Sequence, residues 1–187
     1  MSFDMNAMLV EAARRSGDLA DFGEPSFRPA LQALLTALDT EGKLSDLGRQ
    51  ILNERIIDLL KNRLVVEEYY RNFPQIDDEK IENPIVIVGL PRTGTTLLQR
   101  ILGCDQRLAR VEAMPKLKSI HPFDAEAPDE EGMLLEHSFH AFFDAYADIP
   151  AYTEWMWSHD QTPAYDYLKR MLKFIQWQKR NRGETAS

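Results

Sequence analysis

The sequence contains one cysteine, Cys104, among 187 residues, so no disulfide can form within the chain. A lone thiol is typical of proteins from a reducing compartment, and it packs most often as a small apolar residue. Residues 1–6 lack the basic and apolar parts of a signal peptide, and no apolar run approaches the roughly 18 residues of a membrane span. We therefore predict a cytoplasmic protein without a membrane span.

Basic residues are scarce: 22 Lys and Arg stand against 30 Asp and Glu, and the formal net charge is −8. This balance disfavours nonspecific binding of nucleic acid. The charge is also uneven, because residues 121–161 contain ten acidic residues and no Lys or Arg, whereas residues 162–187 contain six basic and two acidic ones. Either the two stretches face each other, or the acidic residues between 124 and 131 form a solvated loop broken by Pro122 and Pro128, which we favour.

Residues 85–98, with the sequence I-V-I-V-G-L-P-R-T-G-T-T-L-L, run from a β-branched strand candidate through a glycine-bounded loop into a helix candidate. Gly89 and Gly94 have the spacing of the P-loop G-x-x-x-x-G-K-[ST], and Thr96 has its hydroxyl position. The lysine of that motif is missing. Thr95 stands in its place, and the cation is Arg92, three residues earlier.

This loop has the chemistry of a phosphate or sulfate site. Glycines let the backbone approach a ligand closely, and the N–H groups that open a helix point toward a bound anion. Threonine hydroxyls add donors, and the planar guanidinium of Arg92 can hold two oxygens at once. The alternative is an ordinary strand-turn-helix connection, but the motif favours a binding loop formed by Pro91, Arg92, Thr93, Gly94, Thr95 and Thr96.

The segment P-R-T-G-T-T-L-L at residues 91–98 resembles the 5′-phosphosulfate-binding loop of the sulfotransferases, whose usual form is P-[KR]-[ST]-G-[TS]-[TS]. These enzymes transfer a sulfuryl group from 3′-phosphoadenosine 5′-phosphosulfate (PAPS) to a hydroxyl or amine. L-L-E-H-S-F at residues 134–139 and H-D-Q-T-P-A-Y-D-Y-L-K-R at residues 159–170 resemble the helical insert of the bacterial branch. The resemblance implies a PAPS-dependent enzyme that acts on a small organic acceptor and needs no metal.

The resemblance also implies an α/β fold of the P-loop NTPase-like sulfotransferase type. Only residues 84–89 are predicted to form a buried parallel strand, and such a strand needs partners that crossover helices connect. In the family those strands, with an Arg and a Ser for the 3′-phosphate, follow the matching segment. We therefore expect the N-terminal part of the fold only, in a C-terminally truncated member with a shortened connection between Cys104 and Val111.

The flanks are predicted to be helical. Residues 1–80 form a helical N-terminal extension, with helices over 6–15 and 26–38 and a long one from a cap at Ser45 or Asp46 to about Arg71. Residues 72–78 join it to the sulfotransferase-like part, 81–187. The long helix either covers the core, which we favour, or serves as a homodimer contact or an acceptor-site lid, because it has an apolar face made of Leu52, Ile56, Leu59, Leu60 and Leu64.

A second long helix is predicted to begin at Thr162-Pro163 and to end before Gly183. Its apolar stripe consists of Tyr165, Leu168, Leu172 and Ile175. Aromatic residues are dense in the segment before this helix. They either line a pocket for an apolar acceptor, such as an alcohol or a phenol, or they fill the core. They are Phe139, Phe142, Phe143, Tyr146, Tyr152, Trp155 and Trp157.

Sulfuryl transfer builds negative charge on the oxygen that leaves with the nucleotide, and Arg92 can stabilise that charge without donating a proton. An acceptor hydroxyl also needs a general base. Among His121, His137, His140, His159, Glu112 and Glu136 we choose His137, beside Glu136, and His159, beside Asp160. Two alternatives remain: a noncatalytic remnant that binds phosphate only, and a P-loop kinase or NTPase, which would require a lysine in place of Thr95.

Overall fold

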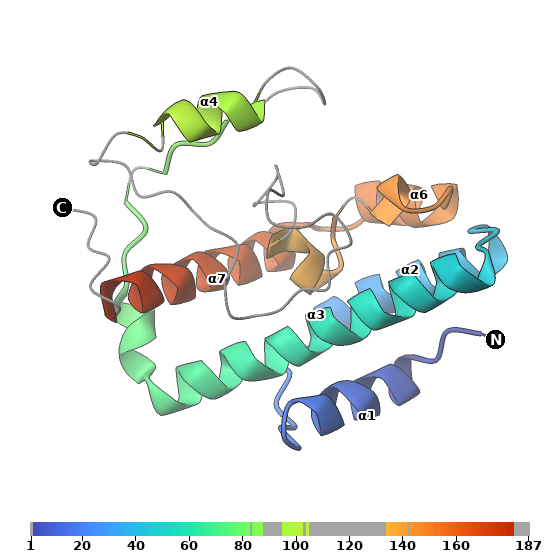
Figure 1. The fold of residues 1–187 in the computed structure, drawn as a ribbon, viewed down its shortest axis with the longest axis horizontal. Helices are drawn as coiled ribbons and strands as arrows, with labels where there is room; N and C mark the ends of the chain where they lie inside the picture. Colours follow the sequence, from blue (N-terminus) through green and yellow to red (C-terminus); the bar gives the residue numbers. More distant parts are fainter. Residues whose placement is uncertain are drawn as a thin grey trace.

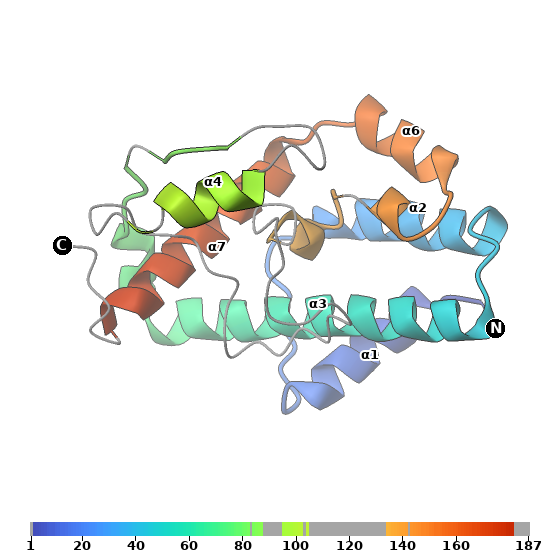
Figure 2. The ribbon, with the colours of Figure 1, turned by 45° about the horizontal axis from the view of Figure 1, so that its top comes forward.

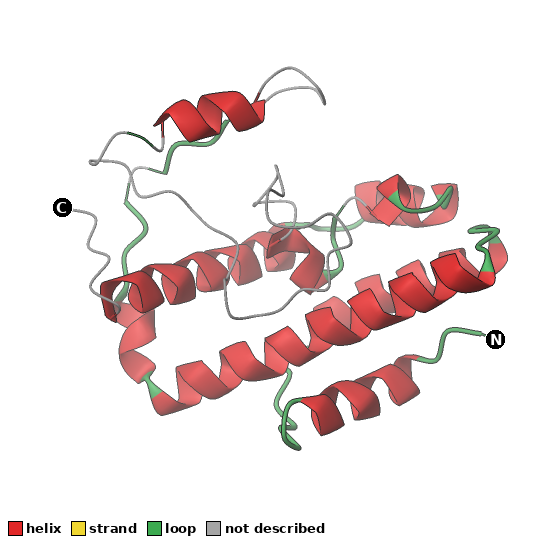
Figure 3. Ribbon diagram, viewed as in Figure 1, coloured by secondary structure: helices red, strands yellow, loops and turns green. Residues whose placement is uncertain are grey.

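The computed structural model describes residues 2–82, 84–87, 95–102, 104, 134–141 and 143–181. The regular structure in these ranges is helical, loops connect the helices, and no strand occurs in the described part (Figure 3). Their elements are the helices α1 (Met5–Arg15), α2 (Phe27–Thr40), α3 (Asp46–Asn72), α4 (Thr95–Leu102), α6 (Pro150–Ser158) and α7 (Thr162–Asn181), and the 3₁₀ turns η1 (Pro74–Asp78), η2 (Glu136–Ser138) and η3 (Phe143–Ala145).

The helices pack as a body around the long α3 (Figure 1). The rotated view shows α1 against one side of α3 and α6 beside α2 (Figure 2). The short turn η2 contacts α2, α3 and α7, so it lies where three helices meet. The body therefore surrounds the segment that contains Glu136 and His137.

The start and end of α3 follow from local chemistry. Ser45 is extended, and its Oγ accepts a hydrogen bond from the backbone N–H of Gly48 at 3.1 Å, which caps the helix. At the other end Phe73 leaves the helical conformation just before Pro74, as expected of a residue that precedes proline. The predicted start of α3 at Ser45 and its predicted end near Arg71 are both confirmed.

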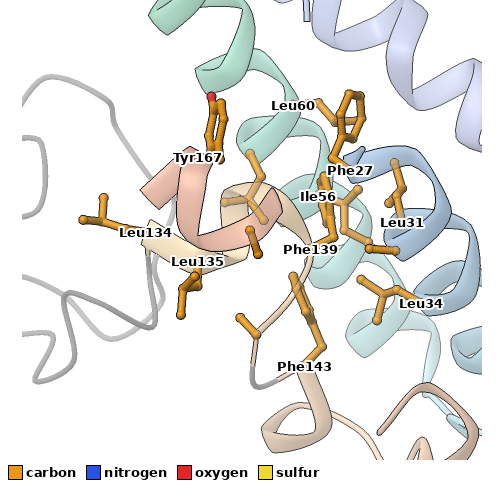
Figure 4. Close-up of a cluster of buried hydrophobic side chains, with 14 of the residues drawn as sticks. Phe27, Leu31, Leu34, Ile56, Leu60, Leu134, Leu135, Phe139, Phe143 and Tyr167 are labelled. Carbon is orange, nitrogen blue, oxygen red and sulfur yellow. The ribbon is translucent and has the colours of Figure 1, made fainter. Parts of the chain in front are cut away.

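The apolar face of α3 is buried inside the chain itself. All five predicted residues are buried, and Figure 4 shows Ile56 and Leu60 beside Phe27 and Leu31 of α2. Phe139 and Phe143 complete the same cluster. This packing supports the interpretation that α3 covers the core, because its apolar face is satisfied without a second chain.

The apolar stripe predicted for α7 is wrong at one position. Tyr165 is 53% exposed, whereas Leu168 and Ile175 are buried. The buried face of α7 begins one residue earlier than predicted, at Ala164 instead of Tyr165, and continues at a spacing of three and four residues. Its buried residues are Ala164, Tyr167, Leu168, Met171, Phe174 and Ile175.

The dense aromatic residues mostly fill the core. Phe139, Phe143 and Tyr152 are each at most 1% exposed, and the Tyr152 hydroxyl donates to the Phe139 carbonyl oxygen at 2.7 Å. Tyr146 and Trp157 differ, because they are 38% and 81% exposed. Phe142 lies outside the described residues.

The buried strand predicted over residues 84–89 is wrong for its described part. Residues 84–87 form no strand, and Ile85 and Val86 are 61% and 60% exposed. A strand needs a neighbour for its backbone hydrogen bonds, and the described ranges offer none. The helix α4 that follows lies apart from the other helices in Figure 1, and its Leu97, Leu98 and Ile101 are also exposed.

None of the described helices is long and apolar enough to cross a membrane.

Candidate active site

The predicted phosphate loop is only partly described. Pro91, Arg92, Thr93 and Gly94 lie outside the described residues, whereas Thr95 and Thr96 form the first turn of α4. The helix thus begins where the motif predicts it. Its opening N–H groups have no partner four residues back within the helix, and such groups are suited to bind an anion.

A second candidate site surrounds η2, and α3 builds it. Besides its apolar face, α3 has a buried polar row, and these side chains are between 1% and 8% exposed. They are Arg55, Asp58, Asn62 and Arg63. The first three are spaced by three and four residues and so lie along one side of the helix, and Arg63 follows Asn62 directly. Three of the four contact η2 directly through Glu136 or His137.

Glu136 is held by two partners. Its Oε2 forms a buried ion pair with Arg55, and its Oε1 accepts a hydrogen bond of 3.0 Å from the Tyr146 hydroxyl. Burial, together with the negative charge of Glu136, raises the pKa of Tyr146 to about 12, so this phenol stays protonated and keeps donating. Both carboxylate oxygens are engaged, which suits Glu136 to an orienting role.

His137 is buried against α3. Its ring Nε2 lies 3.2 Å from Nδ2 of Asn62, and its backbone carbonyl oxygen accepts a hydrogen bond of 2.9 Å from Nη1 of Arg63. Both the ring and the backbone of this residue are thus fixed by one helix. A base needs such fixed geometry and also a free lone pair at the reaction centre.

Arg63 connects η2 to the rest of the body. Its guanidinium lies 4.2 Å from the ring centre of Phe27 and 3.9 Å from that of Tyr167. It also donates to the carbonyl oxygens of Phe22 and Glu24 at distances of 3.1 to 3.2 Å. Burial lowers the pKa of Arg63, but an arginine side chain remains charged at neutral pH.

The structure places His159 in a different environment from His137. His159 is exposed after the last turn of α6, stacks on Trp155 with 4.1 Å between ring centres, and has Nδ1 2.7 Å from the Trp155 carbonyl oxygen. A carbonyl only accepts, so Nδ1 carries the proton and Nε2 keeps the basic lone pair. The buried His140 ring lies 5.5 Å from Trp155.

The sequence analysis missed the residues that orient η2, namely Arg55, Asn62, Arg63 and Tyr146. A signal was present for two of them, because Arg55 and Asn62, with Asp58 between them, lie at helical spacing beside the apolar face of this helix. Among the described residues no group of three or more potential metal ligands occurs.

Residues 84–120, which include the loop, match the family model described as Sulfotransferase family. The structure is similar to that of sulfotransferase STF1 from Mycobacterium tuberculosis H37Rv, with 28% identity, a TM-score of 0.77, and coverage of 91% of this chain and 57% of that one. Its loop segment and its fold are both similar to those of sulfotransferases. No curated protein matches it by sequence.

A second solved structure shows the same fold. Sulfotransferase STF9 from Mycobacterium avium is 22% identical, with a TM-score of 0.75 over 94% of this chain and 55% of that one. The present chain thus spans a little over half the length of both solved structures. The predicted family and the mostly helical sulfotransferase fold are confirmed.

Proposed function

We propose that this sulfotransferase chain binds the 5′-phosphosulfate end of PAPS and takes part in sulfuryl transfer to a hydroxyl or amine of a small organic acceptor. The observation that carries this proposal is the family match over residues 84–120, which includes the whole loop from Pro91 to Thr96. The start of α4 at Thr95 agrees with it.

The role of Arg92 follows from the charge that develops during transfer. As the bond between sulfur and the bridging oxygen breaks, negative charge grows on the departing phosphate. Arg92 and the backbone N–H groups at the start of α4 would stabilise this charge more strongly than the bound donor. Because arginine does not release its proton at neutral pH, its contribution is electrostatic and orienting.

A general base would remove the proton of the attacking hydroxyl. We propose His137 or His159 for this step. Burial and two contacts with α3 support His137, because they fix its position. The tautomer supports His159, because its Nδ1 faces a carbonyl oxygen and its Nε2 keeps the lone pair.

A second candidate function is binding of the nucleotide without turnover. It requires only the anion-binding loop and the first turn of α4, where the family model matches. An assay of sulfuryl transfer from PAPS to a phenol distinguishes the two functions, because only the enzyme produces adenosine 3′,5′-bisphosphate (PAP).

The binding proposal is tested by calorimetric titration with PAP and with ATP. We expect PAP to bind more tightly, and we expect Arg92→Ala to weaken PAP binding by about 1.5 to 3 kcal/mol, roughly ten- to hundredfold, because it removes a charge-assisted contact. Arg28→Ala, which removes an exposed arginine on α2, is the matched control and should bind as the unaltered chain does. Tighter binding of ATP would contradict the assignment.

A further inference from the structure

The helix α7 holds the chain directly after η1, where it begins to run from α3 toward the phosphate loop. The carboxylate of Glu79 is buried there, with 7% of its side chain exposed, and α7 supplies a partner for each of its oxygens. Gln176 donates from Nε2 to Oε2, and Nη1 of Arg180 lies 3.1 Å from both oxygens. A buried carboxylate is stable only with such partners, so Glu79 fixes the chain to α7.

The same helix also binds two backbone carbonyls beside Glu79. Nε2 of Gln176 donates to the carbonyl oxygen of Lys80 at 3.0 Å, and Nζ of Lys173 donates to that of Asp77 at 2.6 Å. A carboxylate and a carbonyl only accept, so the nitrogen of the Gln176 amide must be the atom that faces them. The three side chains of α7 are spaced by three and four residues, so one side of this helix holds the chain.

Beyond this point the described chain is little covered. Lys80, Glu82 and residues 84–86 are exposed, and Figure 1 shows the segment passing from the end of α7 toward α4. The phosphate loop begins at Pro91, 12 residues after Glu79. Among the described residues, Glu79 is therefore the last buried side chain before the loop.

We propose that Glu79, Gln176 and Arg180 are positioning residues for the phosphate loop, because they fix the point from which the chain runs into it. This inference rests on the proposed binding of PAPS by that loop. A segment with a fixed starting point has less conformational freedom to lose when its loop binds a ligand. The donor therefore binds more tightly than it would to the same loop on a loose segment.

These contacts would also stabilise the fold if they had no effect on the loop, and a second ion pair of α7 separates the two roles. Oε2 of Glu67 on α3 lies 2.8 Å from Nη2 of Arg170, and the Glu67 side chain is 10% exposed. Glu67 is thus nearly as buried as Glu79 and is also paired with an arginine of α7. It joins α7 to α3, however, and not to the segment before the loop.

Calorimetric titration with PAP compares the variants Glu79→Gln and Glu67→Gln, which both remove a charge and keep the size of the side chain. We expect Glu79→Gln to weaken PAP binding by roughly three- to tenfold, about the contribution of one hydrogen bond, because the charge-assisted contact with Arg180 is lost. Glu67→Gln should bind PAP as the unaltered chain does, although both variants should lower the urea midpoint. Unchanged affinity in Glu79→Gln, or an equal loss of affinity in both variants, would overturn the inference.

Limited proteolysis tests the attachment without a ligand and so separates this inference from the proposed function. Trypsin cleaves after lysine, and cleavage after Lys80 requires the hydrogen bond between its carbonyl oxygen and Gln176 to open. Gln176→Met removes this bond without changing the cleaved sequence or the helix propensity of α7, so cleavage after Lys80 should be severalfold faster. Glu67→Gln should be cleaved there at the rate of the unaltered chain.

The two measurements distinguish the possible failures. If Gln176→Met is cleaved faster but the unaltered chain does not bind PAP, the attachment to α7 positions the segment and the proposed donor is wrong. Unchanged cleavage after Lys80 in Gln176→Met would overturn the inference itself.

Discussion

Arg63 places a permanent charge inside the body and satisfies it with backbone oxygens. Three carbonyls, those of Phe22, Glu24 and His137, accept from a side chain that is 1% exposed. Removing the guanidinium would leave buried acceptors without donors, which is among the most damaging changes that a protein interior can undergo.

We therefore expect Arg63→Met to lower the free energy of unfolding by about 1 to 3 kcal/mol for each buried carbonyl that it leaves without a donor. Arg28→Met is a matched control, since Arg28 also lies over the Phe27 ring, at 5.5 Å, but is exposed. It should change stability by less than about 0.5 kcal/mol. Urea unfolding of the two variants measures both values, and equal losses would contradict the role given to Arg63.

His140 makes stability depend on pH. Burial lowers the pKa of His140 below its usual value of 6.5, and a hydrogen bond with the Ser138 carbonyl only partly opposes this shift. As pH falls below 6.5 the unfolded chain takes up a proton more readily than the folded one, so stability is lost toward the lowered pKa. The urea midpoint should thus fall between pH 7 and pH 5, and less so in His140→Gln. The same slope in both proteins would contradict this.

At the scale of the element, the helix α3 has a buried apolar face, a buried polar row and an N-terminus capped by Ser45. Ser45 should stabilise it by about 1 kcal/mol, the usual contribution of an N-cap hydrogen bond, so Ser45→Ala should lower the urea midpoint accordingly. Ser26 precedes α2 but makes no side-chain cap hydrogen bond, so Ser26→Ala is the matched control and should have little effect. A larger loss from Ser26→Ala would show that the cap of α3 is unimportant.

At the scale of the whole molecule, stability is concentrated in the body around α3. Leu60 is fully buried there, whereas Leu97 on α4 is 64% exposed. Leu60→Ala should cost about 2 to 5 kcal/mol because it leaves a cavity, and Leu97→Ala should cost less than about 0.5 kcal/mol. Comparable urea midpoints for the two variants would show that α4 packs as part of the body. The division of the chain at residue 80 into two domains stays a prediction.

The sequence by itself determined the features that depend on neighbouring residues. Helix starts and ends follow from caps and prolines, the apolar face of α3 follows from its spacing, and α4 begins at Thr95 because a glycine-bounded loop precedes a helix-forming run. The family was equally visible, since the loop signature is a short contiguous motif. The loop cation Arg92 stays a prediction, because it lies outside the described residues.

Only the tertiary structure decided which distant groups meet. Asn62 and His137 are 75 residues apart in the sequence, and Arg55 and Glu136 are 81 apart, so no local pattern pairs them. The orientation of α7 about its own axis, which exposes Tyr165 and buries Tyr167, was likewise determined by packing against the rest of the structure. The strand predicted at residues 84–89 is absent from its described part, 84–87, for the same reason, because an extended segment becomes a strand only when another segment supplies its hydrogen bonds.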